Sequence, residues 1–182
     1  YVYSFTTAPA AGSRKRFTFA YASDSRDGQG GGERGMFGVN YYIVKKIGAL
    51  ASYKNAEFIQ FTGDLIDGYL YSKDEMNLQY ANWKRSIQPF WHHFSVYTAM
   101  GNHECIMYEF EQGEEEISID RFPFDTHSSE AVFAEQFILP VNGPESEDGS
   151  AYDPNPEATD FPSYKENVYF YTYDNVAVVV LN

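Results

Sequence analysis

Cysteine is almost absent from this sequence. Cys105 is the only cysteine in 182 residues, so it has no partner for an intramolecular disulfide. This excludes a disulfide-stabilised scaffold and a cysteine-rich zinc module, and it leaves the redox compartment open. No basic residue adjoins Cys105 in the sequence, so we expect a small buried side chain and not an activated thiolate.

Long hydrophobic runs are also missing. The longest run in the C-terminal part, Val176–Leu181, has six residues. A helix that spans a bilayer needs about 18 or more apolar residues. We therefore expect no membrane insertion.

Basic residues are scarce. The chain has 13 Lys and Arg residues against 26 Asp and Glu residues, which gives a formal net charge of −13. A field of this sign repels polyanions, so we expect no general binding to nucleic acid or to an anionic membrane. Any phosphate must be bound by local groups. Hydrophobic residues make up 43% and aromatic residues 18%, which is enough for the core of one domain.

Three strand-like segments are separated by two segments with helical periodicity. We expect the strands at Phe17–Ala22, Phe58–Thr62 and Phe94–Ala99. This βαβαβ order predicts an α/β fold with parallel strands and crossover helices. Ligands of such sheets bind at the carboxyl ends of the strands.

The two intervening segments each have one apolar face. These faces consist of Val39, Ile43, Ile47, Leu50 and Ala51 in the first helix and of Met76, Tyr80, Trp83 and Ile87 in the second. We expect Pro89 to end the second helix, because proline lacks the N–H that a helix interior needs.

The remainder of the chain has two parts. Residues 105–165 lack a regular period and are interpreted as an irregular insertion or lid, with one short helix at Ser129–Phe137. After it, Val168–Tyr173 and Val176–Leu181 flank Asp174-Asn175. Asp and Asn tolerate positive φ, so this pattern predicts a terminal β-hairpin with a tight turn.

Polar residues follow each of the three predicted parallel strands. Asp24, Asp64 and Asn102 all fall at the same edge of the sheet, although about 40 residues separate each from the next. Oxygen ligands from neighbouring strand ends suit metal ions, and a carboxylate such as Asp64 can bridge two ions about 3.5–4 Å apart. The alternative is that each residue is only a helix cap or a turn former.

His103 and Glu104 directly follow Asn102. An imidazole beside a metal site can protonate a leaving-group oxygen, and a carboxylate can orient its ring. The alternative is a loop histidine with a solvated glutamate. Gly63-Asp64-Leu65-Ile66-Asp67-Gly68 and Gly101-Asn102-His103-Glu104 together resemble two motifs of the calcineurin-like metallophosphoesterases. The terminal hairpin is similar to that of purple acid phosphatase-like members.

The resemblance implies a function and a set of roles. Asp24 would bind a first metal ion, Asp64 would bridge two ions, and Asn102 would bind the second. His103 would be the proton donor, oriented by Glu104. The two ions would be divalent or trivalent (Fe, Zn or Mn), and the hydroxide that they activate would hydrolyse a phosphomonoester or phosphodiester substrate.

The resemblance also implies how the chain is organised. Residues 1–13 look like the tail of a preceding β-sandwich domain with its linker, and residues 14–182 like the N-terminal half of the metallophosphoesterase domain. The remainder of the catalytic domain, with further histidine ligands, is then expected after Asn182. That upstream domain, the 16 tyrosines and the low count of basic residues favour an extracytoplasmic location, periplasmic or secreted.

Two positions depart from the family pattern. Arg26 stands where the broad family has a metal-binding histidine, and Asp67 stands where purple acid phosphatases have a metal-binding tyrosine. Arg26 could bind a substrate phosphate, or it could pair with Asp27 or Glu33 as part of the loop structure. A non-catalytic binding or assembly protein that keeps the fold is therefore the alternative function.

The remaining candidate groups receive ordinary structural interpretations. The glycine-rich loop Gly28–Gly35 lacks a P-loop signature and is expected to be a flexible turn. His92, His93 and His127 have no spacing typical of a metal site and are expected to serve surface or core roles.

Overall fold

The computed structural model describes residues 2, 6–27, 35–70, 72–107 and 122–181. Outside these residues lie residues 1 and 3–5 of the expected upstream tail, residues 28–34 of the glycine-rich loop and residues 108–121 of the expected insertion. So does Glu33, one of the two partners considered for Arg26.

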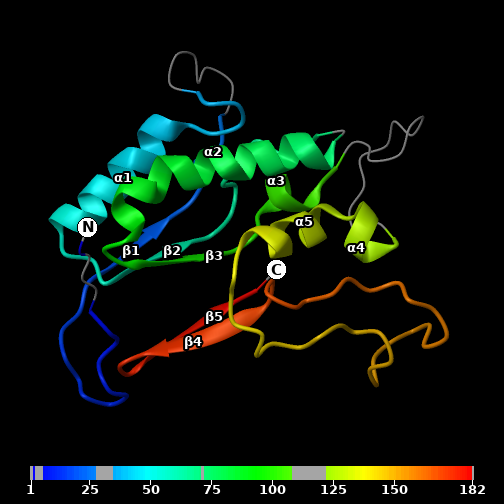
Figure 1. The fold of residues 1–182 in the computed structure, drawn as a ribbon. Coiled ribbons are helices and arrows are strands. Elements are labelled where there is room, and N and C mark those ends of the chain that lie inside the picture. Colours follow the sequence, from blue (N-terminus) through cyan, green and yellow to red (C-terminus); the bar gives the residue numbers. More distant parts are fainter. Residues whose placement is uncertain (1, 3–5, 28–34, 71, 108–121, 182) are drawn as a thin grey trace.

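A parallel sheet of three strands forms the centre of the structure. Its strands, β1 (Phe19–Ala22), β2 (Phe58–Phe61) and β3 (Ser95–Thr98), lie in the order β1-β2-β3. Helices α1 (Tyr41–Tyr53) and α2 (Lys73–Trp91) connect them and cover one face of the sheet (Figure 1). The expected α/β fold with parallel strands and crossover helices is confirmed.

The four apolar residues expected for α2 are all buried, together with Gln79, Asn82 and Ser86. Of the residues expected for the first helix, Val39 and Ala51 are buried, but others are not. Val44, Gly48 and Ala51 are the buried residues of α1, whereas Ile43 is 36% exposed and Leu50 is 58% exposed. Gly48 explains the difference. A Cβ at Gly48 would lie 2.4 Å from a ring carbon of Phe90, so the missing side chain of Gly48 makes room for Phe90 of α2. The periodicity of apolar residues cannot predict this contact, because glycine does not count as an apolar position.

The expectation that Pro89 ends α2 was wrong. The helix continues through Pro89 to Trp91. Its start is fixed by Ser72, whose side chain accepts a hydrogen bond from the backbone N–H of Glu75. Pro89 lies in the last turn, where proline removes one hydrogen bond and the helix is about to end in any case.

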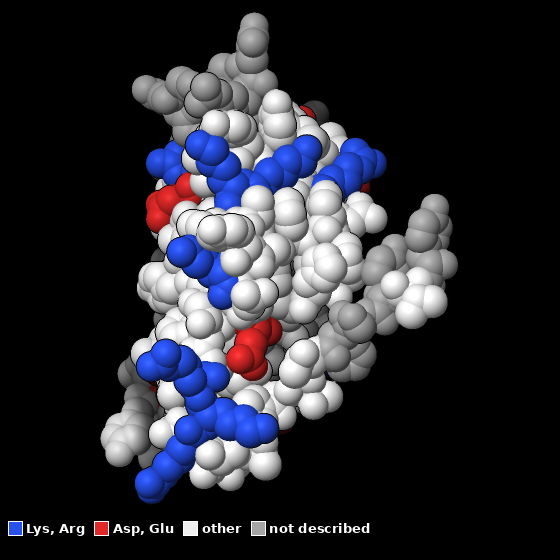
Figure 2. All heavy atoms as spheres, turned by 90° about the vertical axis from the view of Figure 1, so that its left-hand side faces the viewer, with Lys and Arg blue, Asp and Glu red and all other residues white. Residues whose placement is uncertain are grey.

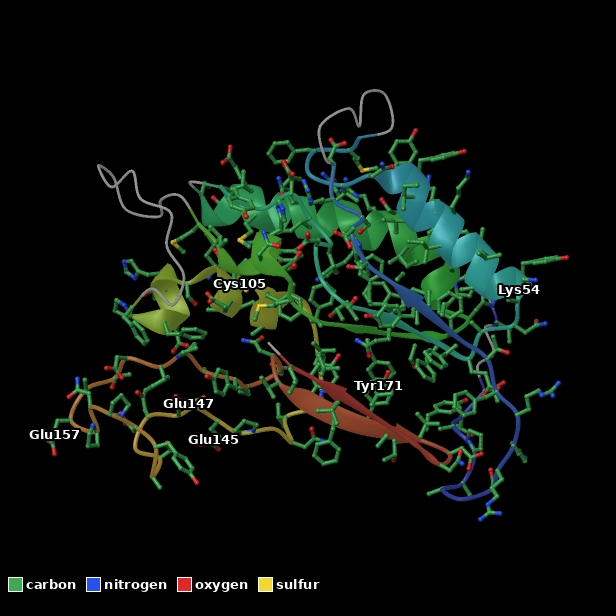
Figure 3. All side chains as sticks on the ribbon, turned by 180° about the vertical axis from the view of Figure 1, so that it is seen from behind. Lys54, Cys105, Glu145, Glu147, Glu157 and Tyr171 are labelled. Carbon is green, nitrogen blue, oxygen red and sulfur yellow. The ribbon has the colours of Figure 1, made fainter. Side chains whose placement is uncertain are left out.

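The expected terminal hairpin is confirmed and forms a third layer. Strands β4 (Tyr169–Tyr173) and β5 (Val176–Val180) pair in antiparallel fashion on the sheet face opposite the helices (Figure 1). In the turn, Asp174 has a φ of 53°. Tyr171 stacks on Tyr97 with ring centroids 4.0 Å apart and points from the hairpin to the sheet (Figure 3).

Strand β2 is buried on both faces. On the helix side, Phe61 packs edge-on against Trp83 of α2, with ring centroids 5.5 Å apart. On the hairpin side, the Tyr171 hydroxyl donates to Oε1 of Gln60 at 2.9 Å. The apolar core therefore extends to both faces of the sheet, and on the hairpin side it includes aromatic contacts such as that of Phe58 with Tyr171, at a centroid distance of 5.7 Å.

The insertion contains more helix than the sequence indicated. Helix α5 (Ser129–Gln136) matches the expected short helix, and α4 (Phe124–His127) precedes it. Residues 140–166 contain no helix or strand, and Glu145, Glu147 and Glu157 lie along them (Figure 3). None of the helices in the described ranges has the length and apolar character needed to cross a membrane.

Candidate metal centre

The loops that follow β1 and β2 are joined by backbone hydrogen bonds. The N–H of Asp24 donates to the carbonyl of Gly63 at 3.2 Å, and the N–H of Ser25 donates to the carbonyl of Asp64 at 2.9 Å. Asp24 and Asp64 have φ values of 58° and 51°. Two non-glycine residues in the left-handed region, side by side, are typical of functional sites, where local strain is retained.

The loops that follow β2 and β3 touch through glycines. A Cβ at Gly63, whose φ is 102°, would lie 2.3 Å from the backbone nitrogen of Gly101. A Cβ at Gly101 would lie 2.2 Å from Oδ1 of Asp64. The glycine of each sequence motif is therefore required for the close approach of Asp64 and Asn102.

Glu104 braces these two loops from beneath. It belongs to the single-turn helix α3 (Asn102–Cys105), and its carboxylate is fully buried. The carboxylate accepts hydrogen bonds from four backbone N–H groups, those of Gly101, Asp64, Leu65 and Ile66, at 2.7 to 3.3 Å. Burial raises the pKa of Glu104 to about 7, although the N–H groups of Gly101, Ile66 and Asp64 favour the charged form.

The ring of His103 is held by a group other than Glu104. Its Nδ1 lies 2.5 Å from the backbone carbonyl oxygen of Asp67, so Nδ1–H is the donor. Its Nε2 lies 4.0 Å from Oδ2 of Asp64. Glu104 therefore does not orient the ring of His103, as was expected. The Asp67 carbonyl holds this ring, and Glu104 holds the loops that follow β2 and β3.

Tyr69 is a site residue that the sequence analysis missed. Its hydroxyl accepts a hydrogen bond of 2.7 Å from Nδ2 of Asn102, and its ring packs edge-on against His103 with centroids 4.5 Å apart. Because the amide nitrogen of Asn102 is used in this way, its amide oxygen is the atom left to bind a metal. A possible signal was the position of Tyr69, directly after Gly68 at the end of the motif.

Arg26 lies over the two aspartates of that motif. Its Nε is 3.7 Å from Oδ2 of Asp64, and its Nη1 is 3.9 Å from Oδ1 of Asp67. Among the described residues, Arg26 forms ion pairs with Asp64 and Asp67 and none with Asp27. Burial and the neighbouring charge of Asp67 raise the pKa of Asp27. Arg26 therefore reaches the expected metal edge itself and does not belong only to its own loop.

The oxygen donors fit metal ions in kind but not as a complete set. Asp24 and Asn102 are exposed. They follow the two outer strands β1 and β3, and Asp64 follows the central strand β2. Hard carboxylate and amide oxygens are suitable ligands for divalent ions. Within the described ranges, however, no three His, Cys, Asp or Glu side chains gather into a metal centre. An ion on the Asp24 side would also share Asp64 with the guanidinium of Arg26.

Comparison with known proteins identifies the family. The family model for calcineurin-like phosphoesterases matches residues 28–175, which is most of the chain. The chain therefore belongs to the calcineurin-like phosphoesterase family, whose general activity is metal-dependent hydrolysis of phosphoesters. No curated protein and no solved structure matches the chain significantly. The match begins after Asp24 and Arg26, and the likeness to purple acid phosphatases stays a prediction.

Proposed function

We propose that this member of the calcineurin-like phosphoesterase family hydrolyses phosphate monoesters or diesters with a dinuclear metal site. The observation that supports this most directly is the ring of His103, held by the Asp67 carbonyl with Nε2 facing Asp64. A histidine fixed beside the motif aspartate is suited to proton transfer at the same edge that would hold the metal ions.

Each residue has a role in this proposal. Two ions (Fe, Zn or Mn) held by Asp24, Asp64 and Asn102 would supply Lewis-acid activation of water and of the phosphoryl group. Because Nδ1–H of His103 donates to the Asp67 carbonyl, Nε2 is the ring atom that binds the second proton of the imidazolium form and would give that proton to the leaving-group oxygen. Tyr69 orients the amide of Asn102, and Glu104 keeps both loops in place.

Arg26 would serve the substrate. Its ion pairs with Asp64 and Asp67 are long, at 3.7 and 3.9 Å, and its side chain is about one-third exposed. The guanidinium could therefore leave these two carboxylates and form charge-assisted hydrogen bonds with the phosphoryl group of a bound substrate. We expect Arg26→Ala to lower phosphoester turnover and Arg26→His to raise the affinity for the first metal ion. Unchanged turnover in Arg26→Ala would assign Arg26 to loop structure.

The decisive experiment compares turnover with and without the proton donor. The protein is loaded with Mn²⁺, Zn²⁺ or Fe and assayed with p-nitrophenyl phosphate and bis-p-nitrophenyl phosphate. We expect His103→Asn to lower kcat by about 10²–10⁴-fold, with little change in metal affinity. His127→Asn, at a partly buried histidine of α4 away from the sheet edge, is the matched control and should leave kcat unchanged. Absence of hydrolysis with every metal in a chain that includes the expected remainder of the domain, or equal activity in His103→Asn, would contradict the proposal.

A non-catalytic binding or assembly role is the second candidate. It is favoured by the ion pair of Arg26 with Asp64, which puts a cation where the family pattern has a metal ligand. Metal analysis separates the two roles. Two ions per chain support the hydrolase, whereas a purified protein that takes up none supports the binding role. From the resemblance, we further propose that any missing ligands come from a remainder of the domain after Asn182, so the analysis should include a chain that contains it.

A further inference from the structure

A large cavity in the described part of the protein lies far from the candidate metal centre. It has a volume of about 860 Å³ and is lined by residues 6–10, by Lys15 and Arg16, and by the segments that lead into β2 and β3. Glu57 and Phe94, which directly precede these strands, belong to its wall. The cavity is therefore at the amino end of the sheet, whereas Asp64 and Asn102 are at the carboxyl end. Its volume is in the range of small-molecule sites, about 300–1,000 Å³.

The rim of this cavity is basic in an acidic protein. Among the described residues, 122–166 contain ten acidic side chains but only one basic one, Lys165. Basic side chains gather on the opposite end of the molecule, where acidic atoms cover only a small area (Figure 2). Lys54 and the irregular segment with Glu145 and Glu157 lie at opposite ends in Figure 3. An anion is therefore attracted to this end and repelled from the other.

The cations of the cavity are available for a ligand. Lys15 and Arg16 are exposed, and among the described residues neither side chain has an ion pair or a hydrogen bond. The backbone beneath them is nevertheless fixed. Asp174 in the hairpin turn accepts hydrogen bonds from the N–H groups of Arg14 at 2.9 Å and Lys15 at 2.7 Å. Two free cations on an anchored backbone form a preorganised anion-binding wall.

The opposite wall has groups that could bind hydroxyls. The Oγ of Ser52 is buried without a hydrogen-bond partner. The carboxylate of Glu57 accepts a hydrogen bond from the Tyr173 hydroxyl through Oε2, which leaves Oε1 for another donor. An unpaired buried hydroxyl is costly unless a ligand or water satisfies it. His93 and Phe94 also line the cavity.

We propose that this cavity binds a hydroxylated organic phosphate of nucleotide or sugar phosphate size. The phosphate group pairs with Lys15 and Arg16, and the hydroxyl groups of the ligand donate to Glu57 and meet Ser52. A free phosphate ion would fill only a small part of the cavity and would leave Oε1 of Glu57 and Oγ of Ser52 without a ligand donor or acceptor. Because the cavity and the metal edge lie at opposite ends of the strands, this ligand is distinct from the ester that the proposed hydrolase would cleave.

The test is calorimetric binding of AMP in the presence of EDTA, so that no metal ion at the other edge can hold the phosphate. Adenosine, which lacks the phosphate, is the matched ligand and should bind at least about tenfold more weakly, since one charge-assisted hydrogen bond is worth about that factor. Lys15→Gln and Arg16→Gln should each weaken AMP binding by about tenfold. Glu57→Ala should weaken AMP binding and leave the weak binding of inorganic phosphate unchanged.

Lys165→Gln controls for net charge, because it removes one cation from the acidic end of the molecule. It should leave AMP binding unchanged. The proposal is overturned if AMP does not bind at millimolar concentration, if adenosine binds equally well, or if Lys165→Gln weakens binding as much as Arg16→Gln does. Loss of AMP binding in Asp64→Asn, with none in Arg16→Gln, would assign the ligand to the metal edge. None of these outcomes depends on hydrolysis.

Discussion

Two buried carboxylates brace the molecule in different regions. At the carboxyl edge of the parallel sheet, fully buried Glu104 accepts hydrogen bonds from four backbone N–H groups of two loops. In the hairpin turn, Asp174 is 5% exposed and ties the turn to the N–H groups of Arg14 and Lys15. Both side chains thus do the same structural task, in that each joins segments that are distant in the sequence.

Their pKa values move in opposite directions. Burial raises the pKa of Glu104 to about 7 and outweighs the hydrogen bonds from Gly101, Ile66 and Asp64. Burial also raises the pKa of Asp174, but the hydrogen bonds from Arg14, Lys15 and Ser13 outweigh it, and the net pKa is lowered. The number of hydrogen bonds therefore does not decide the direction. The cost of burying the charge decides it, because this cost is the larger effect at Glu104 and the smaller one at Asp174.

The largest effect on stability is expected from Glu104→Gln. The amide keeps the shape of the side chain but replaces an acceptor oxygen by a donor NH₂ that faces backbone N–H groups. We expect the free energy of unfolding to fall by about 3–4 kcal/mol, because buried donors lose a charged acceptor. Urea denaturation followed by tryptophan fluorescence measures it. Glu135→Gln, at an exposed ion pair with Lys73, is the control and should cost less than about 1 kcal/mol.

A glycine of the site loops should tolerate substitution less well than a glycine outside them. Gly68 has a φ of 57°, and a Cβ there would lie 1.8 Å from the carbonyl oxygen of His103. Gly12 has a φ of 77° and has no atom within 4 Å of such a Cβ. Gly12→Ala should cost about 1 kcal/mol for backbone strain alone, and Gly68→Ala about 2–3 kcal/mol for strain and clash. If the two variants lost equal stability in thermal unfolding, the site loops would be able to shift and relieve the clash at Gly68.

Much of the fold was predictable because its signals are local. Strand composition, helical periodicity and the turn at Asp174-Asn175 are each contained in a few consecutive residues, and β1 to β3, α2 and the hairpin follow from them. The two errors have a common origin. The face of α1 is set by the contact of Gly48 with Phe90, and the end of α2 by where Pro89 falls in the last turn. Both depend on position and packing and not on composition.

The site was predictable in its residues but not in its contacts. Motif spacing located Asp64, Asn102 and His103, because the ends of parallel strands must meet at one edge. The partners of Glu104, however, are backbone groups up to 40 residues away, and no side-chain pattern encodes an N–H. The hydrogen bond of Asn102 with Tyr69 spans 33 residues and also depends on the path of the loop.

The hairpin brace should respond to pH in a simple way. Since the pKa of Asp174 is lower in the folded state than its ordinary value of 3.8, its contribution to stability is present above that value. This contribution is lost as the pH falls through the folded pKa. We expect Asp174→Asn to lower the urea midpoint at pH 7 and to reduce the difference between wild type and variant below about pH 4. A constant difference down to pH 2 would mean that the carboxylate charge contributes nothing.

The smallest effect on stability is expected from Tyr69→Phe. The variant removes the hydroxyl that accepts from Nδ2 of Asn102 but keeps the ring that packs on His103. Asn102 is exposed, so water can replace the hydroxyl and the free energy of unfolding should change by less than about 1 kcal/mol. The affinity for metal ions should nevertheless fall several-fold, because the amide oxygen of Asn102 is no longer held in one orientation. Tyr53→Phe, at an exposed tyrosine of α1, should change neither quantity in a metal titration. Equal metal affinity in Tyr69→Phe and wild type would remove Tyr69 from the site and leave the loops braced by Glu104 alone.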